Sequence, residues 1–265
     1  MTRRRHVGLA TVAAILLAAG AASAAGGGPD LRAEAFSIRG VEQTLHLFGT
    51  RGGKPVLVTS GDGGWVHLGP DVAAFLASQG YFVVGFDAKA YLSSFTSKSG
   101  PLHSEDVPRD YAALVEYAAR GGSARPLLVG VSEGAGLSVL AATAPEVQPR
   151  IAGVVALGLP DKNELGWRWR DSIIYVTKKT PNEPLFSARE AVTRVSPVPL
   201  AAIHSTHDEF VPLPEIRGIL AQARDPKQLW IIEASDHRFS DNQPELQRRL
   251  KEAIAWIESK VSTAP

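Results

Sequence analysis

The chain has 265 residues, and 28 Lys and Arg against 27 Asp and Glu give a formal net charge of +1 at pH 7. Hydrophobic residues make up 45% and charged residues 21%, which is typical of globular proteins and excludes disordered and fibrous classes. The balanced charge argues against a protein that binds nucleic acid through its phosphates. The absence of cysteine excludes disulfides, Cys-ligated zinc, iron–sulfur clusters and a Cys nucleophile.

The first 24 residues have the features of a secretory signal peptide. Three arginines at 3–5 precede an apolar run at 7–19, and the small residues at 22–24 form a cleavage site. The run is short and rich in Ala and Gly for a transmembrane helix, although an uncleaved anchor is the alternative. Cleavage would remove three arginines and leave a net charge of 25 − 27 = −2. We therefore expect a soluble exported protein that resides in the periplasm.

Beyond residue 31, short apolar segments alternate with segments of helical periodicity, which predicts a mostly parallel sheet with flanking helices. Strands are expected at residues 36–38, 43–48, 55–59, 81–86, 126–131, 151–159, 198–204 and 228–234. Helices are expected at residues 71–78, 108–119, 134–143, 213–223 and 244–259.

The alternation is interrupted at about residues 160–197, where no strand is predicted. This segment contains Trp167, Arg168, Trp169 and Arg170 in succession, followed by a pair of lysines and two internal prolines. We interpret it as a cap-like insertion. No repeat, low-complexity tract or linker divides the chain, so residues 25–265 are predicted to form a single α/β domain.

Ser132 is the central residue of Gly-Val-Ser-Glu-Gly, which matches the pattern G-x-S-x-G. The string alone is a weak signal, but it directly follows a predicted buried strand and opens a predicted helix. A nucleophile elbow requires this context, because the serine sits on a tight strand-to-helix turn with small neighbours. The alternative is an ordinary glycine-rich junction with a capping serine. We predict that Ser132 is a nucleophile in an α/β-hydrolase fold.

A serine nucleophile needs a histidine to accept its proton and an acid to orient that histidine. In α/β-hydrolases the acid and the histidine follow the serine in that order. Asp208 follows the strand that ends near His204, and His237 follows the next strand. Both positions lie where a parallel sheet presents its carboxyl ends, so Asp208 and His237 are the predicted partners of Ser132.

An oxyanion hole needs one backbone N–H after the nucleophile and another from the loop after an earlier strand. Glu133 supplies the first by position. The loop Ser-Gly-Asp-Gly-Gly-Trp at 60–65 follows a predicted strand, and we assign its Asp62 as the second donor. A plain glycine-rich turn is the alternative interpretation of this loop.

Two further groups of polar residues leave their interpretation open. His204 and His207 with Asp208 could ligate a metal, but their spacing is not that of a helical zinc site and no fourth ligand is evident. We favour His204 as a packed strand residue and predict neither a metal nor a cofactor. Asp87 follows a predicted strand and either lines the pocket, with Lys89 and Tyr91, or caps the strand end.

The string Ser-Gly-Asp-Gly-Gly-Trp, the serine elbow, and Asp208 followed by His237 resemble the VirJ/AcvB group of bacterial virulence-associated α/β-hydrolases. The resemblance extends from about residue 54 to residue 257, and the glycine-rich string is its most specific part. It implies export to the periplasm and hydrolysis of aminoacyl-phosphatidylglycerol, with Ser132 as nucleophile, His237 as general base and Asp208 as orienting acid. The sequence departs from the expected pattern at Glu133, where we expect an apolar or aromatic residue, and in its elaborate insertion.

An aminoacyl ester carries an ammonium beside the scissile carbonyl, so acidic residues near Ser132 would help to bind it. Asp62, Glu133 and Asp236 are the expected acids, and Trp65 is a further expected substrate-binding residue. The tryptophans and arginines of the insertion could contact the phosphate and a membrane surface. The simpler alternative is that these tryptophans pack inward and the arginines are solvated.

The favoured function is therefore an exported serine hydrolase that cleaves a carboxylic ester through an acyl-enzyme. A serine peptidase or acyltransferase of the same fold stays open, because a triad determines acyl transfer but not the acceptor. A non-catalytic partner of an export system is the third hypothesis. A complete set of nucleophile, acid, histidine and oxyanion loop argues against it. The expected partners are the ester substrate and a phospholipid headgroup, without nucleic acid.

Overall fold

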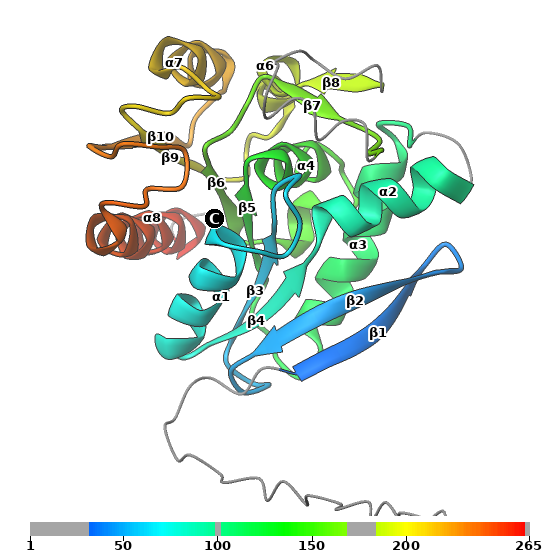
Figure 1. The fold of residues 1–265 in the computed structure, drawn as a ribbon. Coiled ribbons are helices and arrows are strands. Elements are labelled where there is room, and N and C mark those ends of the chain that lie inside the picture. Colours follow the sequence, from blue (N-terminus) through cyan, green and yellow to red (C-terminus); the bar gives the residue numbers. More distant parts are fainter. Residues whose placement is uncertain (1–31, 99–101, 169–183, 263–265) are drawn as a thin grey trace, which may run out of the picture.

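Residues 32–98, 102–168 and 184–262 are described by a computed structural model of the chain. They form one large twisted sheet with helices on both faces (Figure 1). The predicted signal peptide at 1–24 lies outside the described residues. The strands of the large sheet, in spatial order, are β1 (Arg32–Ile38), β2 (Val41–Phe48), β4 (Tyr81–Phe86), β3 (Lys54–Thr59), β5 (Leu127–Val131), β6 (Gly153–Leu157), β9 (Leu200–Ser205) and β10 (Lys227–Ile232).

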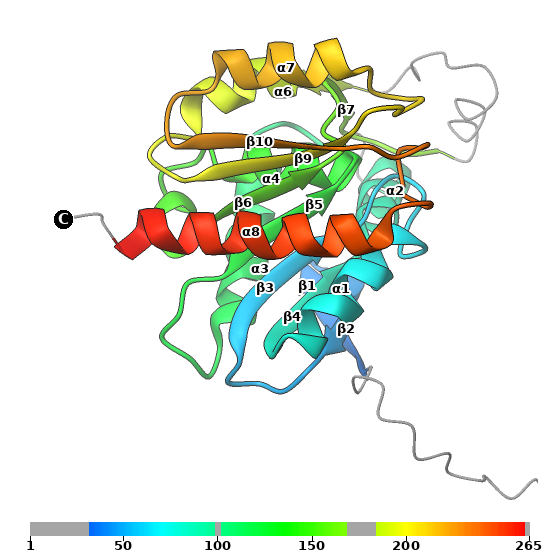
Figure 2. The ribbon, with the colours of Figure 1, turned by 90° about the vertical axis from the view of Figure 1, so that its left-hand side faces the viewer.

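The sheet is parallel from β4 to β10, and only β1 and β2 run antiparallel to their neighbours. Two groups of helices cover its faces, and Figure 2 shows α8 lying across one of them. One face carries α1 (Leu68–Ser78) and α8 (Gln243–Ser262); the other carries α2 (Ala88–Lys98), α3 (Asp106–Ala119), α4 (Glu133–Ala141), α6 (Ala188–Ala191) and α7 (Leu213–Gln222). Within the described ranges, none of these helices is both long and apolar enough to cross a bilayer.

Successive buried residues of the central strands face opposite helical layers. In β3, Val56 and Val58 pack with α1 and α8, whereas Leu57 between them packs with the helices of the other face. The two-residue period of a strand produces this alternation, and burial on both faces explains why the strand sequences are almost continuously apolar. The predicted mostly parallel sheet with flanking helices is therefore confirmed.

The carboxyl ends of the central strands are level with one another. Thr59 at the end of β3 pairs with Gly130 of β5, and Leu157 at the end of β6 pairs with both Val131 and Ile203. The loops that follow these strands therefore converge at one edge of the sheet. Open parallel sheets bind their ligands at this edge.

The interruption at 160–197 contains regular structure that we did not predict. A short antiparallel pair forms between β7 (Lys162–Glu164) and β8 (Leu185–Ser187), and α6 follows it. The side chain of Asn163 packs against Gly136 of α4, where a Cβ atom would lie 1.8 Å from Asn163 Oδ1. The insertion is thus docked onto the helix that follows Ser132. Residues 169–183, with Trp169 and Arg170, lie outside the described residues.

The sequence analysis also missed α2, whose serines and threonine weaken its apolar periodicity. Its first turn is held by Asp87, whose Oδ1 accepts a hydrogen bond from the backbone N–H of Ala90 (3.0 Å). The other oxygen, Oδ2, accepts from the backbone N–H of Trp65 (3.1 Å). Asp87 therefore caps a helix and fixes the loop after β3, and of its two proposed roles the structure supports capping.

Candidate active site

Ser132 lies on the turn between β5 and α4, in the backbone conformation of a nucleophile elbow. Its φ of 51° and ψ of −118° fall in a region that residues with a side chain rarely adopt. The strain is held in place by the sheet, because the N–H of Ser132 donates to the carbonyl of Leu157 at the end of β6 (2.8 Å). The elbow pushes the Ser132 side chain out of the sheet edge toward the loops.

Two glycines around Ser132 are required by close packing. A Cβ atom at Gly130 would lie 2.2 Å from the carbonyl oxygen of Gly134, and one at Gly134 would lie 2.3 Å from that of Ser60. Both contacts are with backbone atoms, which cannot swing away. The elbow is therefore built from a tight fit between β5, α4 and the end of β3.

We expect Gly134→Ala to lower the free energy of unfolding by about 2–3 kcal/mol, because the new methyl group overpacks a rigid site. Gly122→Ala is the matched control, since a Cβ atom at Gly122 meets nothing within 4 Å. That change should be neutral or should stabilise by about 0.4–1 kcal/mol. Urea unfolding of the two variants measures the difference. Equal stability of both would contradict the tight fit at the elbow.

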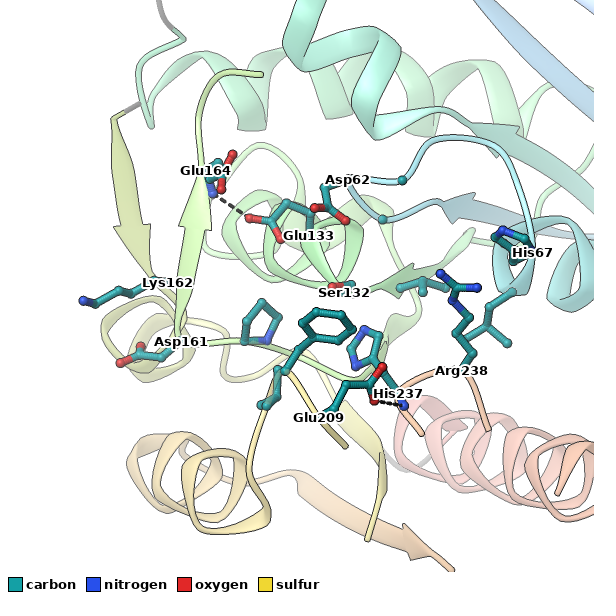
Figure 3. Close-up of a pocket in the computed structure, with 18 of the residues that line it drawn as sticks. Asp62, His67, Ser132, Glu133, Asp161, Lys162, Glu164, Glu209, His237 and Arg238 are labelled. Atoms are coloured by element: carbon teal, nitrogen blue, oxygen red, sulfur yellow. Dashed lines mark hydrogen bonds between the residues drawn. The ribbon is translucent and has the colours of Figure 1, made fainter. Parts of the chain in front are cut away.

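His237 and Asp208 form a buried hydrogen-bonded pair beside the elbow. The distance from His237 Nδ1 to Asp208 Oδ2 is 2.6 Å, and the carboxylate fixes the imidazole with Nδ1 as donor and Nε2 as acceptor. The imidazole lies against Gly158 after β6, where a Cβ atom would be 2.5 Å from His237 Cε1. Figure 3 shows Ser132 and His237 facing the same pocket.

The backbone around Asp208 holds this carboxylate in place. Its Oδ1 accepts hydrogen bonds from the N–H groups of Phe210 (2.9 Å) and Val211 (2.8 Å). Burial acts to raise the pKa of Asp208, but the hydrogen bond from His237 and these backbone N–H groups bring it below its ordinary value. Asp208 is therefore ionised at neutral pH, as an orienting acid must be.

His204 supports the same turn, a role that the sequence did not indicate. Its Nε2 donates to the carbonyl of Val211 (2.9 Å) and lies 3.9 Å from Asp208 Oδ2, while its buried Nδ1 has no partner among the described residues. Burial lowers the pKa of His204, so the imidazole is neutral. In the described part of the chain no three His, Asp or Glu side chains form a group suited to a metal ion.

The loop after β3 is positioned to supply the predicted oxyanion donor. It is held by a turn from Gly61 to Gly64, whose N–H donates to the Gly61 carbonyl (3.0 Å), and Gly61 packs directly against Ser132. The N–H groups of Asp62 and Glu133 have no hydrogen-bond partner among the described residues. Two free backbone donors on the loops next to the nucleophile are what an oxyanion hole requires.

These elements enclose a pocket of about 580 Å³. Four groups of residues line it: the loop after β3, the elbow, the insertion and the loops after β9 and β10. Its lining includes the predicted nucleophile and all of its acidic and basic residues, which are Asp62, His67, Ser132, Glu133, Asp161, Lys162, Glu164, Arg189, Glu209, Glu215, His237 and Arg238 (Figure 3).

One wall of the pocket is acidic. Glu133 is buried, and its Oε1 accepts a hydrogen bond from the backbone N–H of Glu164 (2.7 Å). Burial raises the pKa of Glu133 well above its usual range, and the nearby carboxylates of Asp62 and Glu164 raise it further. Glu164 was missed in the sequence because the insertion brings it to the site. The wall therefore combines the carboxyl groups of Asp62, Glu133 and Glu164.

The raised pKa of Glu133 predicts a pH-dependent stability. Folding favours the protonated carboxyl, so its contribution is fully present below the ordinary value of 4.5 and is lost as the pH rises through the folded-state pKa. Glu133→Gln removes this loss of stability and keeps an oxygen that can accept the backbone N–H of Glu164. We expect the variant to gain stability over the wild type progressively as the pH is raised above 4.5, as measured by urea unfolding. A difference that is constant with pH would contradict a raised pKa.

Two predicted substrate-binding residues do not line this pocket, so these assignments are corrected. Trp65 stacks on His46, with ring centroids 4.8 Å apart, and covers Gly85 of β4. The carboxylate of Asp236 accepts hydrogen bonds from the N–H groups of Arg238 (3.0 Å) and Ser240 (2.9 Å), which holds the turn after His237. Both side chains are held by contacts within the fold, and neither lines the pocket with Ser132.

Of the tryptophans and arginines of the insertion, Trp167 and Arg168 are described. Trp167 packs against the core, its N–H donates to Thr96 Oγ1 (3.0 Å), and the Lys89 ammonium lies 4.3 Å from its ring centroid. The inward-packing alternative therefore holds for Trp167, whereas Arg168 is exposed. Neither side chain lines the pocket.

Solved structures of several hydrolases share this fold at low sequence identity. A membrane phospholipase A described as a bacterial virulence factor matches with a TM-score of 0.61, 14% identity, and coverage of 86% of this chain and 87% of that chain. Est1E from Butyrivibrio proteoclasticus matches with a TM-score of 0.61, 15% identity, and coverage of 86% and 99%. A serine hydrolase involved in carbazole degradation matches with a TM-score of 0.63, 16% identity, and coverage of 86% and 100%. The α/β-hydrolase fold is thereby confirmed.

No curated protein matches the chain in sequence. A family model does, and its description is bacterial virulence protein (VirJ). The match spans residues 54–165, which include the glycine-rich loop after β3, the elbow with Ser132 and the first strand of the insertion. Over this segment, the chain is similar to the VirJ family of bacterial virulence proteins.

Proposed function

We propose that this protein is an exported serine ester hydrolase that acts on aminoacyl esters, with aminoacyl-phosphatidylglycerol as the favoured substrate. The observation that carries the proposal is the joint placement of Ser132, the His237–Asp208 pair and an acidic wall around one pocket. The signal-peptide pattern supports a periplasmic location, where the enzyme would make transient contact with the membrane surface.

The reaction would proceed by two acyl transfers. Ser132 Oγ attacks the ester carbonyl carbon and gives its proton to His237 Nε2, while the N–H groups of Asp62 and Glu133 bind the developing oxyanion. The alcohol leaves with the proton from His237, and the acyl group stays on Ser132 as an ester. Water then attacks this ester, passes a proton through His237 to Ser132, and releases the amino acid.

The acidic wall accounts for the preferred acyl group. The α-ammonium of an aminoacyl ester lies two bonds from the scissile carbonyl carbon, so it falls close to the residues that flank Ser132. Asp62 and Glu133 are in this position, and Glu164 extends the wall. An ammonium there would favour ionisation of Glu133, because an opposite charge lowers a carboxyl pKa. We therefore expect proton release when the substrate binds.

The test is a comparison of kcat/KM for an alanyl or lysyl ester with that for its N-acetylated twin. We expect the free amine to be preferred about tenfold, which corresponds to about 1.4 kcal/mol. Asp62→Asn should reduce this preference to roughly threefold or less, since it removes one charge from the wall.

Asp236→Asn is the matched control, because Asp236 lies outside the pocket and asparagine keeps an oxygen for the N–H groups of Arg238 and Ser240. It should preserve the tenfold preference. Equal rates on both twins by the wild type would remove the basis for an aminoacyl substrate and leave a serine esterase with a different acyl group.

A further inference from the structure

The wall of the pocket opposite the acidic residues carries hydrogen-bond donors without protein partners. Figure 3 shows Arg238 and His67 on one side of Ser132, and Glu133 and Glu164 on the other. Among the described residues, neither the Arg238 guanidinium nor the His67 imidazole has a hydrogen bond or salt bridge to another side chain. The pocket is therefore polarised across its nucleophile.

Several other charged residues in the pocket are already engaged, and Lys162 lies on the opposite side of Ser132 from Arg238 (Figure 3). Arg189 pairs with Asp161 (3.5 Å), and Glu215 accepts the N–H of Asp161 (2.9 Å). The carboxylate of Glu209 accepts the backbone N–H of His237 (2.8 Å). The charge of Arg238 also helps to lower the pKa of Asp236, whose Oδ1 accepts two N–H groups of its own turn. The guanidinium of Arg238 is thus the basic group left available on this side.

The chemistry identifies this side as the one for the leaving group. The proton on His237 Nε2 is transferred to the departing oxygen, so the alcohol of the ester must lie next to His237. Arg238 follows His237 in the chain, and His67 precedes α1 on the adjacent wall. In an ester of glycerol phosphate the phosphorus lies four or five bonds beyond the ester oxygen, on the side of the pocket that Arg238 and His67 line.

We infer that Arg238 and His67 form an anion subsite that recognises an ester whose alcohol carries a phosphate group. This inference rests on the proposed function and deepens it, because it assigns the residues that select the leaving group. Guanidinium groups bind phosphate oxygens through paired N–H donors, and an imidazole donates a hydrogen bond in either protonation state. The acidic wall and this subsite together select a substrate with an ammonium on its acyl part and an anion on its alcohol.

The phosphate could belong to a soluble phosphate ester or to a lipid headgroup. An apolar rim around the pocket bears on this choice. The large hydrophobic side chains that are exposed in the described part of the chain are Val66 (49%), Leu185 (38%) and Phe210 (38%), and all three line this pocket. Exposed apolar residues gathered at a site mark a contact surface. Val66 precedes His67 directly, so an acyl chain attached to a bound phosphate would meet it.

The experiment compares kcat/KM for the alanyl ester of glycerol with that for the alanyl ester of glycerol phosphate. We expect the wild type to prefer the phosphorylated alcohol about tenfold, through a lower KM, and to lose this preference as salt is raised. Arg238→Gln should bring the ratio of the two substrates close to one. Arg217→Gln, an exposed arginine of α7 that does not line the pocket, is the control and should keep the tenfold ratio.

A merely structural role of Arg238 would lower both activities together and leave their ratio unchanged, which would overturn the subsite. A wild-type ratio of one would overturn it as well. Failure to hydrolyse either ester would instead overturn the proposed function, and this inference with it. Aminoacyl-phosphatidylglycerol in phosphatidylcholine vesicles forms the lipid arm. If Val66→Ser lowers kcat/KM only for the lipid in vesicles, the phosphate belongs to a lipid headgroup. If Val66→Ser has the same effect on the vesicle substrate and on the soluble ester, the phosphate belongs to a soluble ester.

Discussion

Ser132→Ala should abolish ester hydrolysis, with kcat lowered by about 10⁶-fold, because no acyl-enzyme can form without the hydroxyl group. Mass spectrometry of the wild type after treatment with a fluorophosphonate should find the adduct on Ser132, because the elbow presents this side chain to the pocket beside His237. The variant should not be labelled. Alanine keeps the small volume of the elbow, so the unfolding temperature of the variant should stay close to that of the wild type.

The control for this experiment is a second serine near the same sheet edge. Ser60 is buried, its hydroxyl accepts the backbone N–H of Ala88 (3.1 Å), and it does not line the pocket. It should remain unlabelled in the wild type. An unmodified Ser132 in folded protein would remove the nucleophile from the proposal, and the hypothesis of a non-catalytic export-system partner would then be favoured.

The parts of the candidate site whose positions follow from the sequence are those determined by strand ends. Ser132, Asp208 and His237 each follow a strand of one parallel sheet, and such strands present their carboxyl ends at the same edge. Their convergence therefore follows from the order of the elements. The close fit of Gly130 and Gly134 is likewise implied by the elbow pattern, since both positions lie within two residues of the nucleophile.

Residues inside loops were harder to place, because the direction of a loop side chain depends on contacts distant in sequence. Trp65 follows the oxyanion loop immediately, yet it turns toward His46 in β2. Asp236 adjoins His237, yet it closes its own turn. Glu164 reaches the acidic wall only because Asn163 docks β7 onto Gly136 of α4, and nothing in the local sequence signals this contact.

Asp208→Asn should lower kcat by about 10⁴-fold while the protein stays folded. Asparagine can donate a hydrogen bond to His237 Nδ1, which would place the proton on Nε2 and leave the imidazole unable to accept the proton of Ser132. The 2.6 Å contact between Asp208 Oδ2 and His237 Nδ1 makes this acid, rather than its neighbours, responsible for the tautomer. Steady-state kinetics on a simple ester, with thermal unfolding as a check of the fold, measure the effect.

Glu209→Gln provides the contrast that makes the assignment decisive. Glu209 approaches the same histidine, but its Oε2 accepts a hydrogen bond from the backbone N–H of His237 (2.8 Å) and none from the ring. Glutamine retains an oxygen for that bond, so the loss in kcat should stay below about tenfold, equivalent to less than about 1.4 kcal/mol. Nearly normal activity of Asp208→Asn together with an inactive Glu209→Gln would reverse the roles of the two acids. Asp208 is held in a buried turn, where Val211 makes hydrogen bonds with both Asp208 and His204. This turn argues that Asp208, not Glu209, orients His237.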